Sequence, residues 1–204
     1  MYQVPAFIET RADVLHDLIR THPLGLLVTA GPAGIVANPL PFQLVVEDER
    51  VVLRAHLSRA NPQLIELDNA ECLVVFQGPH GYVSPSWYAT KAETGKVVPT
   101  WNYIIVQARG RAQRIDDAAW LRMQIEALTD AQEAGRSEAW AVADAPDDFI
   151  AAQIKGIVGV EIAVAQMDGK WKLSQNRNAA DHAGVVEGLV ARGQTDLAVA
   201  MKGE

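Results

Sequence analysis

Three apolar segments separated by two short turns constrain the fold of this chain most strongly. Residues 24–30, 35–46 and 51–56 read LGLLVTA, IVANPLPFQLVV and VVLRAH, and the turns between them read GPAG and EDER. Turns this short join antiparallel neighbours, because parallel strands need a crossover of about a dozen residues or more. The middle strand is expected to be an edge strand or bulged, since Pro39 and Pro41 cannot donate ladder hydrogen bonds.

The rest of the chain predicts more strands and several helices. Strands are expected at residues 72–78 and 103–115, and residues 159–173 predict a hairpin with its turn at Asp168-Gly169. Apolar periodicity and capping residues predict helices before Pro23, at Pro62, over residues 116–133, from about residue 146, and from residue 179 with a break at Gly193.

Residues 78–103 are predicted to form a long irregular segment. They read GPHGYVSPSWYATKAETGKVVPTWNY and combine Gly, Pro and Ser with aromatic rings. A long irregular segment in a compact domain is usually functional or disordered, and the aromatic rings argue against disorder. This segment is therefore expected to be folded and to serve the function of the protein.

The strand groups are expected to share one sheet, because neither group alone has enough strands to close a core. We therefore predict a single α+β domain over residues 1–204, an antiparallel barrel with helices packed outside it and a helical tail at the C-terminus.

The charge balance is acidic, with 25 Asp and Glu against 18 Lys and Arg and a net charge of −7. Nucleic-acid binding depends largely on Lys and Arg neutralising phosphates, and here the basic residues are dispersed, so the charge does not support DNA binding. The single cysteine, Cys72, lies in an apolar run and is expected to be a buried, inert thiol. No signal peptide and no membrane span are expected, which makes the cytoplasm the default location.

Residues 56–62, HLSRANP, are the first candidate site. His56, Ser58, Arg59 and Asn61 lie between a strand and a helix. A helix N-terminus offers N–H groups to an anion, and Arg can bind two of its oxygens, so this stretch suits a phosphate. The structural alternative is that Ser58 or Asn61 only caps the helix and that Arg59 is solvated.

Residues 82–88 and 99–103, YVSPSWY and PTWNY, are the second candidate. Thr100, Trp101 and Asn102 interleave short polar groups with an aromatic ring. Rings and short polar groups suit a planar heterocycle, by stacking on its face and bonding its edge. The alternative is a packed loop whose rings cover the mouth of the barrel.

Residues 170–177, KWKLSQNR, are the third candidate. Strand alternation would turn Trp171 and Leu173 inward and place the polar residues on the other face. The candidate binding residues of this stretch are Lys172, Ser174, Gln175 and Asn176. An exposed strand face is the alternative.

The common catalytic signatures are missing from the sequence. It contains no GxSxG, P-loop, HExxH or CxxC motif, and its histidines are scattered. No metal site and no catalytic residue are therefore assigned.

The segments HLSRANPQ, FQGPHGYVSPSWY, KVVPTWNY and KWKLSQNR, in this order, resemble the PaiB family. Its members are described as FMN-binding negative transcriptional regulators. The resemblance covers nearly the whole chain and implies a split β-barrel, as in flavoproteins related to pyridoxamine-phosphate oxidase, and a homodimer with FMN at the subunit interface.

The resemblance also implies roles for particular residues. It places the FMN phosphate at Ser58, Arg59 and Asn61, and the Trp171-Lys172-Leu173 stretch near the cofactor. Lys172 stands where the wider fold group has Arg, which weakens the transfer of an oxidase activity because Lys is not a bidentate fork. On this resemblance, residues 56–62 match the phosphate of FMN. Residues 82–88 and 99–103 match its ring face, and residues 170–177 match its N1–O2 edge.

Three functions remain open from the sequence. The first is an FMN-binding transcriptional regulator, the second an FMN-dependent oxidoreductase or flavin reductase, and the third a haem-binding split-barrel protein with His56 or His80 as axial ligand. The predicted cofactor-binding set is His56, Ser58, Arg59, Asn61, Thr100, Trp101, Asn102, Lys172, Ser174, Gln175 and Asn176.

Overall fold

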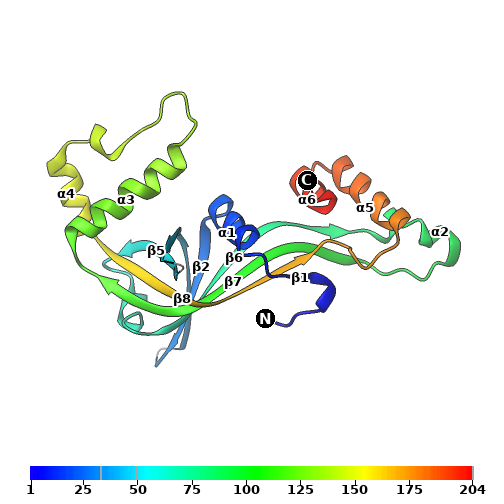
Figure 1. The fold of residues 1–204 in the computed structure, drawn as a ribbon, viewed down its shortest axis with the longest axis horizontal. Coiled ribbons are helices and arrows are strands. Elements are labelled where there is room, and N and C mark those ends of the chain that lie inside the picture. The colour runs from blue at the N-terminus through cyan, green and yellow to red at the C-terminus, as the bar shows by residue number, and fades with distance from the viewer. Residues whose placement is uncertain (33, 49, 204) are drawn as a thin grey trace. The chain divides into compact units, whose positions relative to one another are not determined.

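The computed structural model describes residues 1–32, 34–48 and 50–203. Within these ranges eight strands are hydrogen-bonded in the order β3-β2-β6-β7-β8-β5-β4, and β1 pairs with β8 (Figure 1). The strands are β1 Ile8–Glu9, β2 Leu24–Gly31, β3 Gly34–Pro41, β4 Gln43–Glu47, β5 Arg50–Ser58, β6 Glu71–Val83, β7 Thr100–Ile115 and β8 Ile157–Lys172.

The described residues also form helices between and after the strands. The longer ones are α1 Ala12–Thr21, α3 Ala118–Glu133, α4 Asp147–Lys155, α5 Ala179–Ala191 and α6 Thr195–Lys202. Short helical turns are η1 Pro5–Phe7, η2 Pro62–Glu66, η3 Pro85–Trp87, α2 Thr90–Thr94 and η4 Val142–Asp144. The strand order begins at β3 and ends at β4, so the described sheet is not closed. The predicted α+β fold, an antiparallel split β-barrel with peripheral helices, is confirmed.

The antiparallel start of the chain is also confirmed. Strands β2 and β3 form one hairpin, and β4 and β5 form the next. The predicted middle strand is divided at Phe42 into β3 and β4, and both lie at edges of the strand order, where the prolines of β3 are tolerated. The two predicted turns include Ala33 and Glu49, which lie outside the described residues.

The predicted hairpin at residues 159–173 is wrong, because residues 159–172 belong to one strand, β8. Gly169 pairs with Glu9 of β1 and takes no turn conformation. A Cβ atom at Gly169 would lie 2.3 Å from the Leu15 side chain and 2.8 Å from the Glu9 carbonyl oxygen. Asp168-Gly169 therefore serves a close approach of the backbone, which the sequence pattern cannot distinguish from a turn.

The predicted irregular segment is also largely wrong. Residues 78–83 continue β6 and residues 100–103 begin β7, so only residues 84–99 lie outside strands, and these include η3 and α2. A Cβ atom at Gly81 would lie within 2.8–3.0 Å of the side chains of Gln194 and Leu197. The glycine that suggested a loop thus allows α6 to pack against the strand.

The predicted helices are confirmed, with small changes. The Asp117 side chain caps α3 by accepting a hydrogen bond from the Trp120 N–H at 2.7 Å. Ile150 and Ile154 of α4 are buried, and Gly193, with φ 72°, separates α5 from α6. None of the described helices is long and apolar enough to cross a membrane.

The chain divides into two compact units. The first contains Met1–Leu15, Gln77–Val106 and Asp168–Glu204, and the second contains His16–Phe76 and Gln107–Met167. Buried apolar side chains of the first unit include Val83, Val185, Leu189 and Leu197. Those of the second include Leu27, Phe42, Leu53 and Phe76. A single domain over residues 1–204 stays a prediction.

Candidate functional site

A small polar cavity in the first unit brings together two of the stretches singled out in the sequence. Its volume is about 110 Å³, and its lining residues are Phe7, Thr100, Asn102, Lys172, Ser174, Asn176 and Arg177. Strand β7 supplies Thr100 and Asn102, while the end of β8 and the turn after it supply the last four. We call this site the Lys172 cavity.

Lys172 is held by neutral oxygen atoms. Its Nζ donates to Thr100 Oγ1 at 2.5 Å and to the Trp101 carbonyl oxygen at 2.7 Å. Burial lowers the pKa of the Lys172 ammonium, and the positive charges of Lys170 and Arg177 lower it further. The cavity therefore carries an excess of positive charge.

Asn102 and Ser174 are the buried polar residues of the cavity lining, and we call this pair the Asn102–Ser174 layer. Asn102 is fully buried, and its Nδ2 and Oδ1 lie 2.9 Å and 3.2 Å from Ser174 Oγ. Ser174 has φ 65°, in the left-handed region that few residues other than Gly adopt, and it turns the chain away from β8. Lys172, Ser174 and Asn176 reach one cavity through this turn and not along one strand face, because β8 ends at Lys172.

Gln175 has a different place from the one expected. Its Oε1 accepts a hydrogen bond from the Leu173 N–H at 2.8 Å, and its Nε2 donates to the Trp171 carbonyl oxygen at 2.6 Å. Gln175 therefore stabilises the turn and is absent from the cavity lining.

Arg177 and Asn176 supply hydrogen-bond donors that the protein does not use. The Arg177 guanidinium carbon lies 4.6 Å from the centre of the Tyr88 ring, a cation–π distance. Among the described residues, neither the Arg177 guanidinium nor the Asn176 amide has a hydrogen-bond or ion-pair partner. Both lie at the cavity, where a ligand could accept these bonds.

The aromatic rings of the second stretch do not line this cavity. Trp101 is 48% exposed; its Nε1 donates to His80 Nδ1 at 3.2 Å, and its ring stacks on the His80 ring at 6.0 Å. Tyr82 meets the Trp101 ring edge-on at 6.1 Å. Trp87 instead packs where a Cβ atom at Gly188 of α5 would fall. The predicted rings thus separate into an exposed cluster of His80, Tyr82 and Trp101 and a group packed inside the unit.

The predicted phosphate-binding stretch lies in the second unit, and each guanidinium nitrogen of its arginine has a partner within that unit. Arg59 Nε and Nη2 donate to the carbonyl oxygens of Lys155 and Ile157 at 3.0 Å and 2.9 Å. Its Nη1 lies 2.7 Å from the Asp116 carboxylate. Arg59 is thus anchored to its own unit and is not simply solvated.

The other residues of that stretch make local hydrogen bonds. Ser58 Oγ accepts from the Ala60 N–H at 3.3 Å. Asn61 Oδ1 accepts from the Gln63 N–H at 2.9 Å and so caps η2, as the structural alternative proposed. His56 Nδ1 lies 2.7 Å from Oε1 of the buried Gln124. We call the group of His56, Ser58, Arg59 and Asn61 the Arg59 corner.

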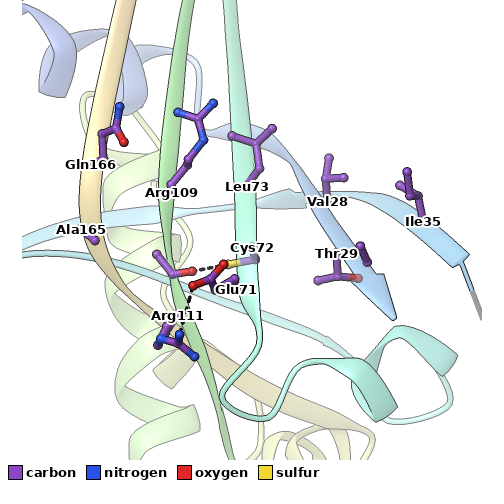
Figure 2. A pocket seen from close by; sticks show the side chains of 12 residues that line it. Val28, Thr29, Ile35, Glu71, Cys72, Leu73, Arg109, Arg111, Ala165 and Gln166 are labelled. Carbon is purple, nitrogen blue, oxygen red and sulfur yellow. Dashed lines mark hydrogen bonds and ion pairs between the residues drawn. The ribbon is translucent and has the colours of Figure 1, made fainter. Parts of the chain in front are cut away.

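A wider groove in the second unit was not anticipated from the sequence. Its volume is about 450 Å³, and it is lined mainly by β2, β6, β7 and β8 (Figure 2). Cys72 lies in it, and burial raises the pKa of its thiol to about 11, which fits the expected inert cysteine. Arg111 lies 3.0 Å from the Glu71 carboxylate. Its lining residues lie on strands whose side chains alternate between the two faces of the sheet in the ordinary way. The sequence pattern therefore does not distinguish groove residues from core residues.

The predicted binding set also lacks Phe7 and Arg177 of the Lys172 cavity. Arg177 closes the KWKLSQNR stretch, so its position there was the available signal. Phe7 lies near the N-terminus, far from each motif along the chain, and only the pairing of β1 with β8 explains its presence.

Comparisons with known proteins identify the family of this chain. The model of the family described as "Putative FMN-binding domain" matches residues 1–166. An uncharacterised protein of Emericella nidulans is 36% identical over 226 residues, covering 93% of this chain and 90% of that protein. Protease synthase and sporulation protein PAI 2 of Bacillus subtilis is 31% identical, with 93% and 89% covered.

A solved structure supports the fold. The FAD and haem binding protein from Mycobacterium smegmatis matches with a TM-score of 0.62 at 20% identity, over 86% of this chain and 78% of that one. At this identity the likeness concerns the fold alone.

Proposed function

Because the chain belongs to the PaiB family of FMN-binding domains, we propose that it binds FMN as a homodimer and that the Lys172 cavity forms part of the cofactor site. One observation carries the proposal for the cavity. The structure gathers two separate motif stretches around a cavity with excess positive charge and unused donors.

The chemistry of the cavity residues fits FMN. The phosphate and the polar edge of the flavin ring accept hydrogen bonds, and the cavity offers an ammonium, a guanidinium and an amide. When bound, FMN would supply redox chemistry, while the protein supplies binding and orientation. The Arg59 corner, where the sequence led us to expect the phosphate, has its guanidinium bonded to two carbonyl oxygens and the Asp116 carboxylate, so we propose the Lys172 cavity in its place.

The size of the cavity supports a site shared between two chains. Its volume of about 110 Å³ is below the roughly 300–1,000 Å³ of typical ligand pockets. One cavity can therefore hold only part of FMN, and the rest needs further protein surface. A second copy of the chain would provide it in a two-fold assembly.

We propose that the flavin serves a regulatory role, which the name of the Bacillus subtilis relative, a protease synthase and sporulation protein, supports by analogy. The net charge of −7 and the dispersed basic residues favour action through another molecule over direct DNA binding. A promoter complex of the purified chain that survives physiological salt and competitor DNA would contradict this.

The test of cofactor binding is an absorbance spectrum of the purified protein followed by a fluorescence titration with FMN. Saturable quenching of flavin fluorescence is expected. A Soret band in place of flavin bands would instead establish the haem alternative, and reduction of bound FMN by a nicotinamide donor with turnover would favour the oxidoreductase.

The test of assembly is light scattering at micromolar concentration. A mass of about twice 22.2 kDa is expected. A monomer that still binds FMN would contradict the shared site.

A further inference from the structure

The Lys172 cavity has more hydrogen-bond donors than acceptors to receive them. Lys172 uses its ammonium for two bonds, to Thr100 and Trp101, which leaves one N–H over. In the part of the chain that the structure describes, the Arg177 guanidinium and the Asn176 amide donate to no protein group. Asn176 is exposed and Lys172 and Arg177 are half-buried, so water can reach these donors and a ligand rich in acceptor oxygens can take its place.

The charges around the cavity favour an anion. Lys170, Lys172 and Arg177 lie close enough for the other two to lower the pKa of Lys172. Lys170 is buried; its Nζ donates to the Tyr2 carbonyl oxygen at 3.1 Å and lies 5.6 Å from the Tyr103 ring centre. Lys172 and Arg177 have no carboxylate partner within the described ranges, so their mutual repulsion is not relieved by the protein.

The volume of the cavity selects the size of the anion. A water molecule in the liquid occupies about 30 Å³, so a cavity of about 110 Å³ accommodates a group of a few heavy atoms. This suits an oxyanion better than the whole of a fused ring system. The guanidinium of Arg177 adds a planar fork that can bind two phosphate oxygens at once.

We propose that the Lys172 cavity is a phosphate-binding site and that, in the FMN complex, it binds the cofactor phosphate in place of the Arg59 corner. The assignment to FMN rests on the proposed function. Lys172 and Arg177 neutralise the phosphate, Asn176 donates to it, and the Asn102–Ser174 layer holds the turn that presents these side chains.

The first experiment compares FMN with riboflavin, which lacks the phosphate, in fluorescence titrations. Lys172→Met should weaken FMN binding by about tenfold to a hundredfold, the effect of losing one charge-assisted hydrogen bond. Riboflavin binding should change by no more than about twofold. Arg59→Gln is the matched control, because it removes the cation of the other corner, and it should leave both affinities within about twofold.

The second experiment uses inorganic phosphate and no flavin. Phosphate should raise the melting temperature of wild type and Arg59→Gln above that in chloride at equal ionic strength, but not that of Lys172→Met or Arg177→Gln. Melting temperatures in chloride report whether each variant folds.

The outcomes separate the two proposals. Equal loss of FMN and riboflavin binding in Lys172→Met would overturn the phosphate assignment and leave FMN binding standing. Stabilisation by phosphate that depends on Lys172, without any flavin binding, would uphold the phosphate site and overturn the cofactor. Equal stabilisation of wild type and Lys172→Met by phosphate would overturn the site itself.

Discussion

The Lys172 cavity and the Arg59 corner contain the same kinds of side chain, yet their cations are in opposite situations. Each combines a cation, a hydroxyl and a side-chain amide. Arg59 donates to two carbonyl oxygens and an Asp116 carboxylate, whereas Lys172 is held by neutral oxygens and Arg177 has no described polar partner. The difference teaches that a binding site requires donors left unused by the fold, in addition to the right residue types.

The position of each cation in the topology explains the difference. Lys155 is the last residue of α4, where carbonyl oxygens lack helical partners, and the Arg59 side chain satisfies one of them. Lys172 ends a strand beside two further cations, Lys170 and Arg177. The fold thus uses the Arg59 cation for internal contacts, whereas the cations of the Lys172 cavity lack a carboxylate partner among the described residues, which is why we propose binding there.

Charge reversal at the two positions should give the largest contrast. Lys172→Glu should weaken FMN binding by about a hundredfold or more, since it removes a charge-assisted contact and adds a repelling carboxylate. Arg59→Glu should cost about 1–2 kcal/mol of unfolding free energy, because it leaves two carbonyls and Asp116 without their donor, and should change FMN affinity by no more than about threefold. Fluorescence titration and thermal melts measure both. Equal loss of FMN affinity in the two variants would contradict the proposed difference between the Lys172 cavity and the Arg59 corner.

Removing the buried layer of the cavity should give the next largest effect, on stability. Asn102 is fully buried and bonds Ser174, so Asn102→Ala should lower the unfolding free energy by about 1–3 kcal/mol. Urea unfolding measures this loss. An unchanged midpoint would show that the Asn102–Ser174 pair does not support the turn.

The pH dependence of FMN binding tests whether Lys172 contacts the ligand. The expected change in FMN affinity is smaller than in the variants above, up to about tenfold. The pKa of Lys172 is lowered from 10.5 by burial and neighbouring cations, so its charge is lost, and affinity falls, at lower pH than for an ordinary lysine. Lys172→Arg should flatten the profile from neutral to mildly alkaline pH, because Arg stays charged. An identical profile in this variant would exclude Lys172 as the titrating contact.

The lowered pKa of Lys172 also makes the stability of the ligand-free protein depend on pH. The folded-state pKa of Lys172 lies below its unfolded value, so the unfolded chain binds more protons in the window between the two values. The contribution of Lys172 to stability therefore rises with pH across that window, while FMN affinity falls.

The smallest expected effect is at the Arg59 corner. Asn61→Ala removes the cap of η2 and should cost about 0.5–1 kcal/mol without changing FMN affinity. Chemical denaturation and the FMN titration measure the two quantities. A tenfold or larger loss of affinity would return the phosphate to this corner.

The sequence predicted the hairpins of the first strands, the long helices and the fold class, because these depend on local turn chemistry and apolar periodicity. It failed at Gly81 and Gly169, which it assigned to a loop and a turn. Both glycines lie in strands where a neighbouring segment approaches too closely for a Cβ atom. A glycine permits either a turn conformation or the close approach of another segment, and the sequence does not show which of the two it permits.

The sequence by itself determined which stretches carry polar and cationic groups, the antiparallel sheet and the family resemblance, since residue types and their spacing are properties of the chain. Only the tertiary structure decided which cations remain available. Arg59 meets the end of α4 and Asp116, while Lys172 and Arg177 meet each other around the turn at Ser174. Partners of this kind are brought together by folding from distant parts of the chain, so the balance of donors and acceptors at a site cannot be counted along the sequence.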